Sequence, residues 1–237
     1  MCNESRSKTV CARAAGLMLA VAAALVVSLP GTAFAQVQPV CGPEIKDEVA
    51  KALAAVEGAS AAQQAAVQAQ LYEKYQYCVQ DVQAFATPAF YNAARQCGAS
   101  VSNLGNLYFE EISCCGYDPQ RRQFACPLKI KQRTGFGAAP LPGSREYVLH
   151  CVADANGVLQ PVGQDSVHLS NEQYGAPPSW QFAVIANANT NLQLVQPMNG
   201  ATRQARSILS WGISPNNNCA FNPIWGNALN YRIRLDQ

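Results

Sequence analysis

The pattern of apolar and polar residues changes near Gly98. Before this point, apolar residues recur at steps of three and four, and Ala, Gln, Glu and Lys dominate. After it, apolar and polar residues alternate in short runs separated by Gly, Pro and Asn. The first period is that of an amphipathic helix, and the second is that of a half-buried strand. The sequence therefore predicts an α+β protein, with a helical segment over residues 36–98 and a β-rich domain over residues 99–237.

Residues that favour helix ends outline a helical hairpin and a short third helix. A helix commonly starts with Pro or with a Ser or Thr cap, and it commonly stops at Gly. Such signals place helices at 43–58, 60–85 and 87–97. The first two are joined by a short turn, so they should lie antiparallel. The third is short and should dock against the rest of the chain.

Alternation of apolar and polar residues predicts about eight short strands after Gly98. The expected strands cover residues 107–113, 124–130, 145–153, 158–162, 180–186, 192–196, 207–211 and 229–236. Asn156-Gly157 suits a tight turn, so the third and fourth strands should form a hairpin. In the third strand, Leu149 and Cys151 are expected to face the core. Short strands with Gly, Pro and Asn turns are typical of an antiparallel β-sandwich or barrel.

The first 35 residues have the order of a secretory signal peptide. Three basic residues precede an apolar run at 14–29, and Ala33-Phe34-Ala35 supplies the small residues of a cleavage site. The run is shorter than the roughly twenty residues needed to cross a bilayer. We therefore expect residues 1–35 to be cleaved and the mature protein to have no membrane span; an uncleaved anchor is the alternative. The expected location is extracytoplasmic, which covers secreted, periplasmic and cell-surface proteins.

Removing the leader makes the chain electrically neutral. The full chain has 17 Lys and Arg and 15 Asp and Glu; the leader contains three of the basic residues and one of the acidic ones, which leaves 14 of each. A neutral protein has no field that gathers phosphates, so no nucleic-acid partner is expected. Lys129, Lys131 and Arg133 alternate with apolar residues, which indicates the solvent face of a strand; an anion-binding patch is the alternative.

Eight cysteines follow the leader, and their distribution predicts disulfides, which are typical of exported proteins. Three lie in the helical segment and five in the β-rich domain, so full pairing requires at least one bridge between the two parts. Cys114 and Cys115 are neighbours and should take different partners. We expect four bridges, with Cys126 and Cys151 buried. The cysteines are Cys41, Cys78, Cys97, Cys114, Cys115, Cys126, Cys151 and Cys219.

The sequence offers little support for catalysis. It has no Cys-x-x-Cys pair, no Gly-x-Ser-x-Gly turn and no phosphate-binding glycine loop. We therefore expect neither a metal nor a cofactor. Two carboxylates can hydrolyse glycosides without any local motif, and the candidates are Glu110, Glu111, Glu146, Asp154 and Asp165. These side chains are expected to be solvated, with Glu110 and Glu111 on opposite faces of one strand.

Binding or structural use is the leading functional hypothesis. We expect a secreted or cell-surface structural or interaction protein without catalysis, stabilised by disulfides. A carbohydrate or cell-wall binding module is the first alternative, because aromatic rings stack on sugars and amides bond hydroxyl groups; a hydrolase is the second. Trp225, Tyr174 and Asn217 are the candidate binding residues, and Trp225 is expected to be exposed in its loop. The expected partner is a protein or a polysaccharide at the cell surface.

Overall fold

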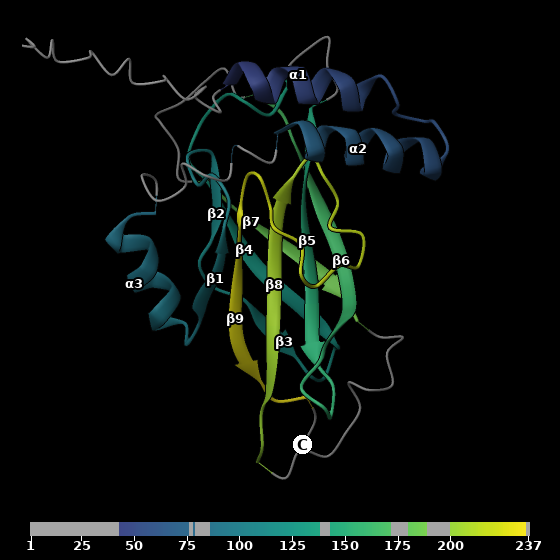
Figure 1. Cartoon of the computed structure of the whole chain (residues 1–237). Helices are drawn as coiled ribbons and strands as arrows, with labels where there is room; N and C mark the ends of the chain where they lie inside the picture. The colour runs from purple at the N-terminus through teal and green to yellow at the C-terminus, as the bar shows by residue number, and fades with distance from the viewer. Residues whose placement is uncertain are drawn as a thin grey trace, which may run out of the picture. The chain divides into compact units, whose positions relative to one another are not determined.

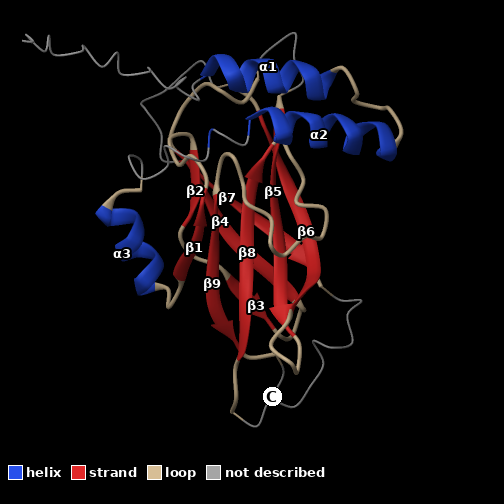
Figure 2. Cartoon of the chain, in the orientation of Figure 1, coloured by secondary structure: helices blue, strands red, loops and turns tan. Residues whose placement is uncertain are grey.

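The structure, a computed structural model, confirms the α+β class. It describes residues 43–75, 78, 86–137, 143–171, 180–188 and 200–235. Within these residues it contains three α-helices and nine β-strands in two sheets (Figure 1, Figure 2). The helices are α1 (Pro43–Ala54), α2 (Ala61–Tyr75) and α3 (Pro88–Gln96). The strands are β1 (Ser100–Leu104), β2 (Glu110–Ile112), β3 (Gly116–Asp118), β4 (Gln123–Ile130), β5 (Ser144–Ala153), β6 (Leu159–Leu169), β7 (Trp180–Asn187), β8 (Arg203–Trp211) and β9 (Asn227–Ile233).

The strands form a two-sheet sandwich with antiparallel pairing throughout. One sheet has the order β1-β9-β8-β5-β6, and in the other β4 pairs with β2, β3 and β7. The inner faces of the sheets meet in one core, where the Phe124 ring of β4 stacks on the His150 ring of β5 at 4.9 Å. At one edge the sheets approach closely, because a Cβ added at Gly163 of β6 would lie 3.0 Å from the Asn187 carbonyl of β7.

Strand β5 is buried on both faces, which corrects one part of the prediction. Val148 faces the second sheet and belongs to the main core. Leu149 and Cys151 point the other way and belong to a separate small cluster. The loop after β8 covers this cluster, because Phe221 packs against it and Cys219 is bonded to Cys151. The predicted burial of Leu149 and Cys151 is therefore confirmed, but their face meets the loop and not the second sheet, since a strand covered on both sides has no polar face to mark its orientation.

The helices begin at the predicted capping residues. At the start of α2, the Ser60 hydroxyl accepts a hydrogen bond from the Gln63 backbone at 3.4 Å, and the Gln63 side chain accepts one from the Ser60 backbone at 3.1 Å. At the start of α3, the Thr87 hydroxyl accepts a hydrogen bond from the Phe90 backbone at 3.2 Å. α1 and α2 lie side by side and antiparallel (Figure 1). The predicted extension of α2 beyond Tyr75 falls almost entirely outside the described residues.

Each predicted strand that falls within the described residues is present, although some differ in length. β6 continues to Leu169, well past the predicted end at residue 162. The predicted strand at 192–196 lies outside the described residues. The alternation pattern misses β1 and β3, because β1 carries mostly exposed or half-buried polar residues and β3 has only three residues.

Disulfides tie these elements together as the cysteine distribution predicts. The bridges among described residues are Cys97–Cys114, Cys115–Cys126 and Cys151–Cys219. Cys78 is also disulfide-bonded, and Cys41 lies outside the described residues. The bridge from the end of α3 joins the helical part to the strands, and the adjacent cysteines take different partners. Cys126 and Cys151 are fully buried, as expected.

The disulfides bear on the cellular location of the protein. Three disulfides are the chemistry of an oxidising compartment. No helix in the described part of the chain is long and apolar enough to cross a membrane. The predicted leader at residues 1–35 lies outside the described residues, so its cleavage stays a prediction.

Candidate functional site

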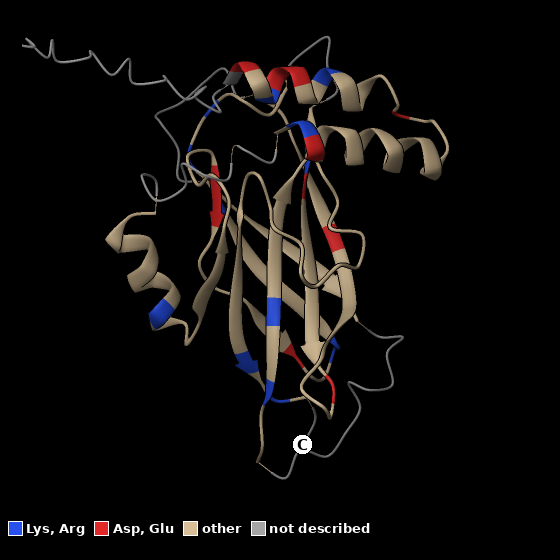
Figure 3. Cartoon of the chain, in the orientation of Figure 1, with Lys and Arg blue, Asp and Glu red and all other residues tan. Residues whose placement is uncertain are grey.

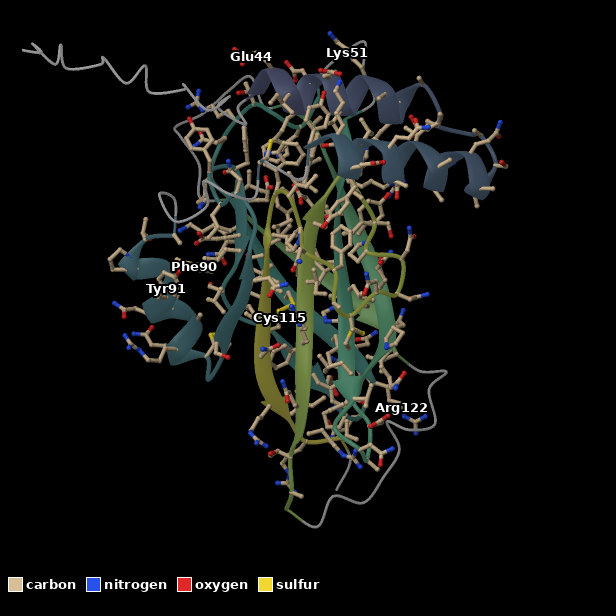
Figure 4. The ribbon with its side chains drawn as sticks, in the orientation of Figure 1. Glu44, Lys51, Phe90, Tyr91, Cys115 and Arg122 are labelled. Carbon is tan, nitrogen blue, oxygen red and sulfur yellow. A yellow bond between two sulfur atoms is a disulfide. The ribbon has the colours of Figure 1, made fainter. Side chains whose placement is uncertain are left out.

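Lys46 brings its amine into the interior of the protein. Residues three and four apart share one side of a helix, so Lys46 lies on the same face of α1 as Val49 and Ala50. All three residues are buried, and the Lys46 side chain is 0% exposed. Glu44 and Lys51, on the same helix, project to solvent (Figure 4). α1 lies across one end of the sandwich, and its inward face therefore carries a cation.

Two buried glutamates, one from each sheet, accompany this cation. Lys46 Nζ lies 2.9 Å from Glu110 Oε2 of β2, and Glu146 of β5 interacts electrostatically with both residues. Figure 3 shows acidic positions on β2 and at the start of β5, at the strand ends nearest α1. Both glutamates are 0% exposed. Among the described residues, neither Glu146 oxygen has a hydrogen-bond partner, and the same holds for Glu110 Oε1.

Aromatic rings enclose the Lys46 amine. The distances from Nζ to the ring centroids are 4.1 Å for Phe109, 4.2 Å for Trp211, 4.5 Å for Phe136 and 5.9 Å for Trp225. The two indoles meet edge to face at 5.2 Å. Trp211 Nε1 donates a hydrogen bond to Ser144 Oγ at 2.7 Å, which fixes the orientation of that ring. Rings at these distances stabilise a cation and shield it from water.

Burial shifts the pKa values of these three groups toward their neutral forms. It lowers the pKa of Lys46, although the neighbouring Glu110 and Glu146 carboxylates oppose that shift. It raises the pKa of Glu110, where the Lys46 charge opposes the shift. Burial and then the Glu110 charge raise the pKa of Glu146 well above its usual value. Because two carboxylates that share one buried cation cannot both ionise favourably, the protonated form of Glu146 is favoured.

A hollow of about 220 Å³ lies on the surface between α1, α2 and the ends of β5 and β6. Its polar lining consists of Glu57, Gln64, Gln68, Arg145, Tyr147 and His168. Leu53 supplies apolar surface, and a Cβ added at Gly212 would lie 3.1 Å from Leu53 Cδ1, so only glycine fits there without a shift. Ser144 lines the hollow and also accepts the Trp211 hydrogen bond, so the hollow adjoins the enclosed lysine.

A second polar group lies deeper in the sandwich. His150 Nδ1 is 2.8 Å from Ser207 Oγ, and that hydroxyl is 2.8 Å from Tyr231 Oη. Burial lowers the pKa of His150 to about 3, so the imidazole is neutral at physiological pH. The ring is 0% exposed. These hydrogen bonds satisfy His150 Nδ1, whereas the buried Nε2 has no hydrogen-bond partner among the described residues.

The structure shows where two of the three residues predicted to bind a partner lie. Trp225 is 0% exposed and packs against Trp211, so the expectation that it is exposed is wrong. Its loop folds back over the end of the sandwich, and the ring fills the lysine enclosure. Asn217 is exposed, in a turn where its φ is +60°, and therefore does not share a surface with Trp225. Tyr174 lies outside the described residues.

The candidate carboxylates divide into two groups. Glu110 and Glu111 do lie on opposite faces of β2, as predicted. Glu111 Oε2 lies 3.0 Å from Lys131 Nζ and its Oε1 lies 3.7 Å from Lys129 Nζ, on the outer face of the sheet. Glu110, Glu111 and Glu146 are all buried, so the prediction of solvated side chains is wrong for these three. Their burial removes the open cleft that a pair of hydrolytic carboxylates requires.

A sequence signal for the buried cluster exists. Glu110 and Glu146 each precede a buried apolar residue by two positions, at Ile112 and Val148, and strand residues two apart share a face. Lys46 similarly occupies the apolar face of its helix. Ionisable residues in phase with core positions are candidates for a buried charge cluster, but the sequence does not show which of them meet.

Comparisons with known proteins find no family model that matches the chain and no curated protein that is similar to it. Within the described residues, no group of three or more His, Cys, Asp or Glu side chains is arranged to hold a metal ion.

Proposed function

We propose that the protein is a disulfide-stabilised, extracytoplasmic interaction protein without catalytic activity. In this proposal its partner contacts the hollow between the α1–α2 hairpin and the ends of β5 and β6. The observation that carries it is the composition of the hollow, where Arg145, Glu57, His168 and two glutamine amides lie beside the apolar side chains of α1. Polar groups that converge beside apolar surface are typical of binding sites that orient a ligand.

A peptide segment of a protein partner fits this lining best. Arg145 can hold a carboxylate through two parallel hydrogen bonds. Gln64 and Gln68 can each donate and accept hydrogen bonds, which suits the alternating groups of a peptide backbone. Leu53 and Tyr147 offer contact surface for an apolar side chain. The disulfide-tied strands below the hollow supply a rigid base.

A polysaccharide is the second candidate, because the same amides and the Tyr147 ring can bind hydroxyl groups and sugar faces. The burial of Trp225 weakens this candidate, since it removes the largest aromatic platform expected at the surface. A hydrolase receives less support, because Glu110 and Glu146 lie inside the closed core.

The test compares two arginine variants of the exported full chain. Arg145→Ala removes the cation of the hollow, whereas Arg232→Ala removes an exposed arginine of β9 that does not line it. Both proteins are applied to a peptide array and to insoluble polysaccharides. We expect peptide retention that weakens roughly 10- to 100-fold in Arg145→Ala, the loss of one charged hydrogen bond, and no change in Arg232→Ala. Equal binding by both variants, or retention on polysaccharide alone, contradicts the peptide proposal.

A separate experiment tests the predicted extracytoplasmic location. The protein is expressed in a bacterial host that exports signal-peptide proteins, and the mass of its amino-terminal peptide is measured in each cell fraction. We expect the chain to start near residue 36 and to be found outside the cytoplasm. Recovery of the uncleaved chain from the cytoplasm, with free thiols, would contradict it.

A further inference from the structure

The Lys46 cluster has the parts of a reaction that needs no outside molecule. An amine from α1 and a carboxyl group from β2 are held 2.9 Å apart, although the two residues are 64 positions apart in the sequence. We propose that Lys46 and Glu110 condense to form an internal amide bond that joins α1 to β2, with Glu146 as the proton-transfer group. The proposal goes beyond the interaction role proposed above and does not rest on it.

The geometry brings the reacting groups together before reaction. Because Oε2 is bonded directly to the Glu110 carbonyl carbon, an Nζ at 2.9 Å from Oε2 stands next to the atom it would attack. Groups fixed at near-contact distance react as if at very high concentration. Rings on several sides hold the Lys46 amine in this place. The folded protein itself therefore supplies the positioning that a condensation requires.

Glu146 is the carboxyl group of the cluster that is not part of the Lys46–Glu110 ion pair. Its carboxyl group is fully buried, and neither oxygen has a hydrogen-bond partner among the described residues. A buried polar group without a partner is costly, so its retention beside an amine and a second carboxyl group calls for a role. In this structure the Glu146 oxygens make no hydrogen bond to Lys46 or Glu110, so the Glu146 side chain must turn toward the pair to act. A protonated acid within hydrogen-bond reach of the reacting atoms can donate one proton and accept another, as general acid and base.

The step balances without an added reagent. A proton passes from the Lys46 ammonium to the Glu110 carboxylate, which leaves a neutral amine and a neutral acid. The Nζ lone pair attacks the Glu110 carboxyl carbon and forms the C–N bond. Glu146 gives its proton to the departing hydroxyl oxygen and takes the surplus proton from Nζ. The C–O bond breaks, one water leaves, and Glu146 ends protonated as it began.

The environment favours the amide over the ion pair. In water, condensation is opposed because an ammonium and a carboxylate must first lose their charges. Inside the enclosure that cost is reduced, since burial lowers the pKa of Lys46 and raises the pKa of Glu110. A buried ion pair also carries a large desolvation penalty. The amide is neutral and carries no such penalty. The water that forms is released from a site that the aromatic rings shield from bulk solvent.

The bond would fasten the α1–α2 hairpin permanently to the sandwich. The Cys97–Cys114 bridge already joins the end of α3 to the strand region. An amide between α1 and β2 would do the same for the hairpin, and reducing agents would not break it. The hairpin forms one wall of the hollow, so the bond would also fix the width of that hollow.

Mass spectrometry of the wild-type protein tests the proposal directly. The exported chain is purified, its disulfides are fully reduced, and its intact mass is compared with the mass of its sequence. We expect a deficit of about 18 Da, one water, and a branched peptide that contains both Lys46 and Glu110 after proteolysis. Full sequence mass, with Lys46 recovered in a linear peptide, would overturn the proposal. A water loss that maps to any other pair of residues would overturn it as well.

Variants separate the roles of the three residues. Lys46→Met and Glu110→Ala should each show the full mass of their own sequence. Glu146→Gln keeps the shape of the proton-transfer group but not its acidity, and we expect it to fold with its disulfides while the amide forms at least 10-fold more slowly. Glu111→Gln, on the outer face of the same strand, should lose water as the wild type does. An unchanged rate in Glu146→Gln would overturn the role of Glu146, and loss of the amide in Glu111→Gln would show that folding alone explains the variants.

Discussion

Glu110 and Glu111 are neighbours on β2, yet they belong to charge clusters on opposite sides of the same sheet. Glu110 lies 2.9 Å from Lys46 inside the sandwich, and Glu111 lies 3.0 Å from Lys131 on its outer face. The distances are nearly equal. The side chains of the inner pair are 0% exposed, whereas in the outer pair Glu111 is 8% and Lys131 is 21% exposed. Burial, and not distance, is what distinguishes the two clusters.

This difference determines what each cluster can do. At the surface, water and salt screen the lysine–glutamate attraction, and such pairs contribute about 0–1 kcal/mol. In the core, each charge has lost its hydration, so the partners depend on one another and on the residues that enclose them. The outer cluster has two lysines for one carboxylate. The inner cluster has one lysine for two carboxyl groups, which favours the protonated form of Glu146.

Removing one lysine from each cluster should give the largest difference in stability between the inner and the outer cluster. Lys46→Met leaves two carboxyl groups buried without a partner, whether the wild type holds the ion pair or the proposed amide, and we expect it to lower the free energy of unfolding by roughly 3–5 kcal/mol. Lys131→Met should lower it by about 0–1 kcal/mol. Urea unfolding followed by fluorescence, at one protein concentration and pH, measures both. Similar losses in the two variants would show that the inner cluster is no more coupled to folding than the outer one.

A double-mutant cycle on each cluster should show a smaller difference between the two clusters, in the coupling energy of their residues. Once Lys46 is gone, replacing Glu110 with Leu removes a group that has already lost its partner. We therefore expect the two inner substitutions to be non-additive by about 1–3 kcal/mol, whereas Lys131→Met and Glu111→Leu should add to within about 0.5 kcal/mol. The measurement is the free energy of unfolding for each single and double variant. Additivity in the inner pair would contradict direct coupling of Lys46 to Glu110.

The sequence predicts most of the scaffold on which these clusters lie. β4 alternates strictly, with Phe124, Cys126, Leu128 and Ile130 buried between more exposed residues. Helix starts at Ser60 and Thr87 follow from local hydrogen bonds that any chain with these caps would form. Such features depend on neighbouring residues only. They are therefore visible in the sequence, and the structure confirms them.

Features that depend on which other part of the chain covers a helix or strand cannot be predicted from neighbouring residues. From Tyr147 to Ala153, β5 carries no charged residue on either face, so the alternation cannot show that Val148, and not Leu149, meets the second sheet. Trp225 lies in a loop rich in Pro and Asn, which predicts exposure, but the loop folds over the sandwich end and buries the ring. The contact between Lys46 and Glu110 spans 64 residues. Only the assembled fold brings that pair together.

The pH dependence of stability should distinguish the interior from the surface by its sign. The folded pKa of Glu146 lies above the unfolded value near 4.5, so its stabilising contribution is complete below that value and is lost as pH rises toward the folded pKa. The folded pKa of Asp154 is lowered, first by the hydrogen bond it accepts from the Val158 backbone. Its contribution is therefore present above the unfolded value near 3.8 and is lost as pH falls.

Two substitutions measure these opposite signs. Between about pH 5 and pH 8, Glu146→Gln should become more stable relative to the wild type by up to about 1.4 kcal/mol per pH unit, because the variant has no proton to lose. Asp154→Asn should show no such trend over that range and should differ from the wild type most where the Asp154 carboxylate is ionised. Urea unfolding at a series of pH values gives both curves. A parallel course for Glu146→Gln and the wild type would mean that Glu146 is ionised in the folded protein, and the assignment of a buried proton to the inner cluster would then fail.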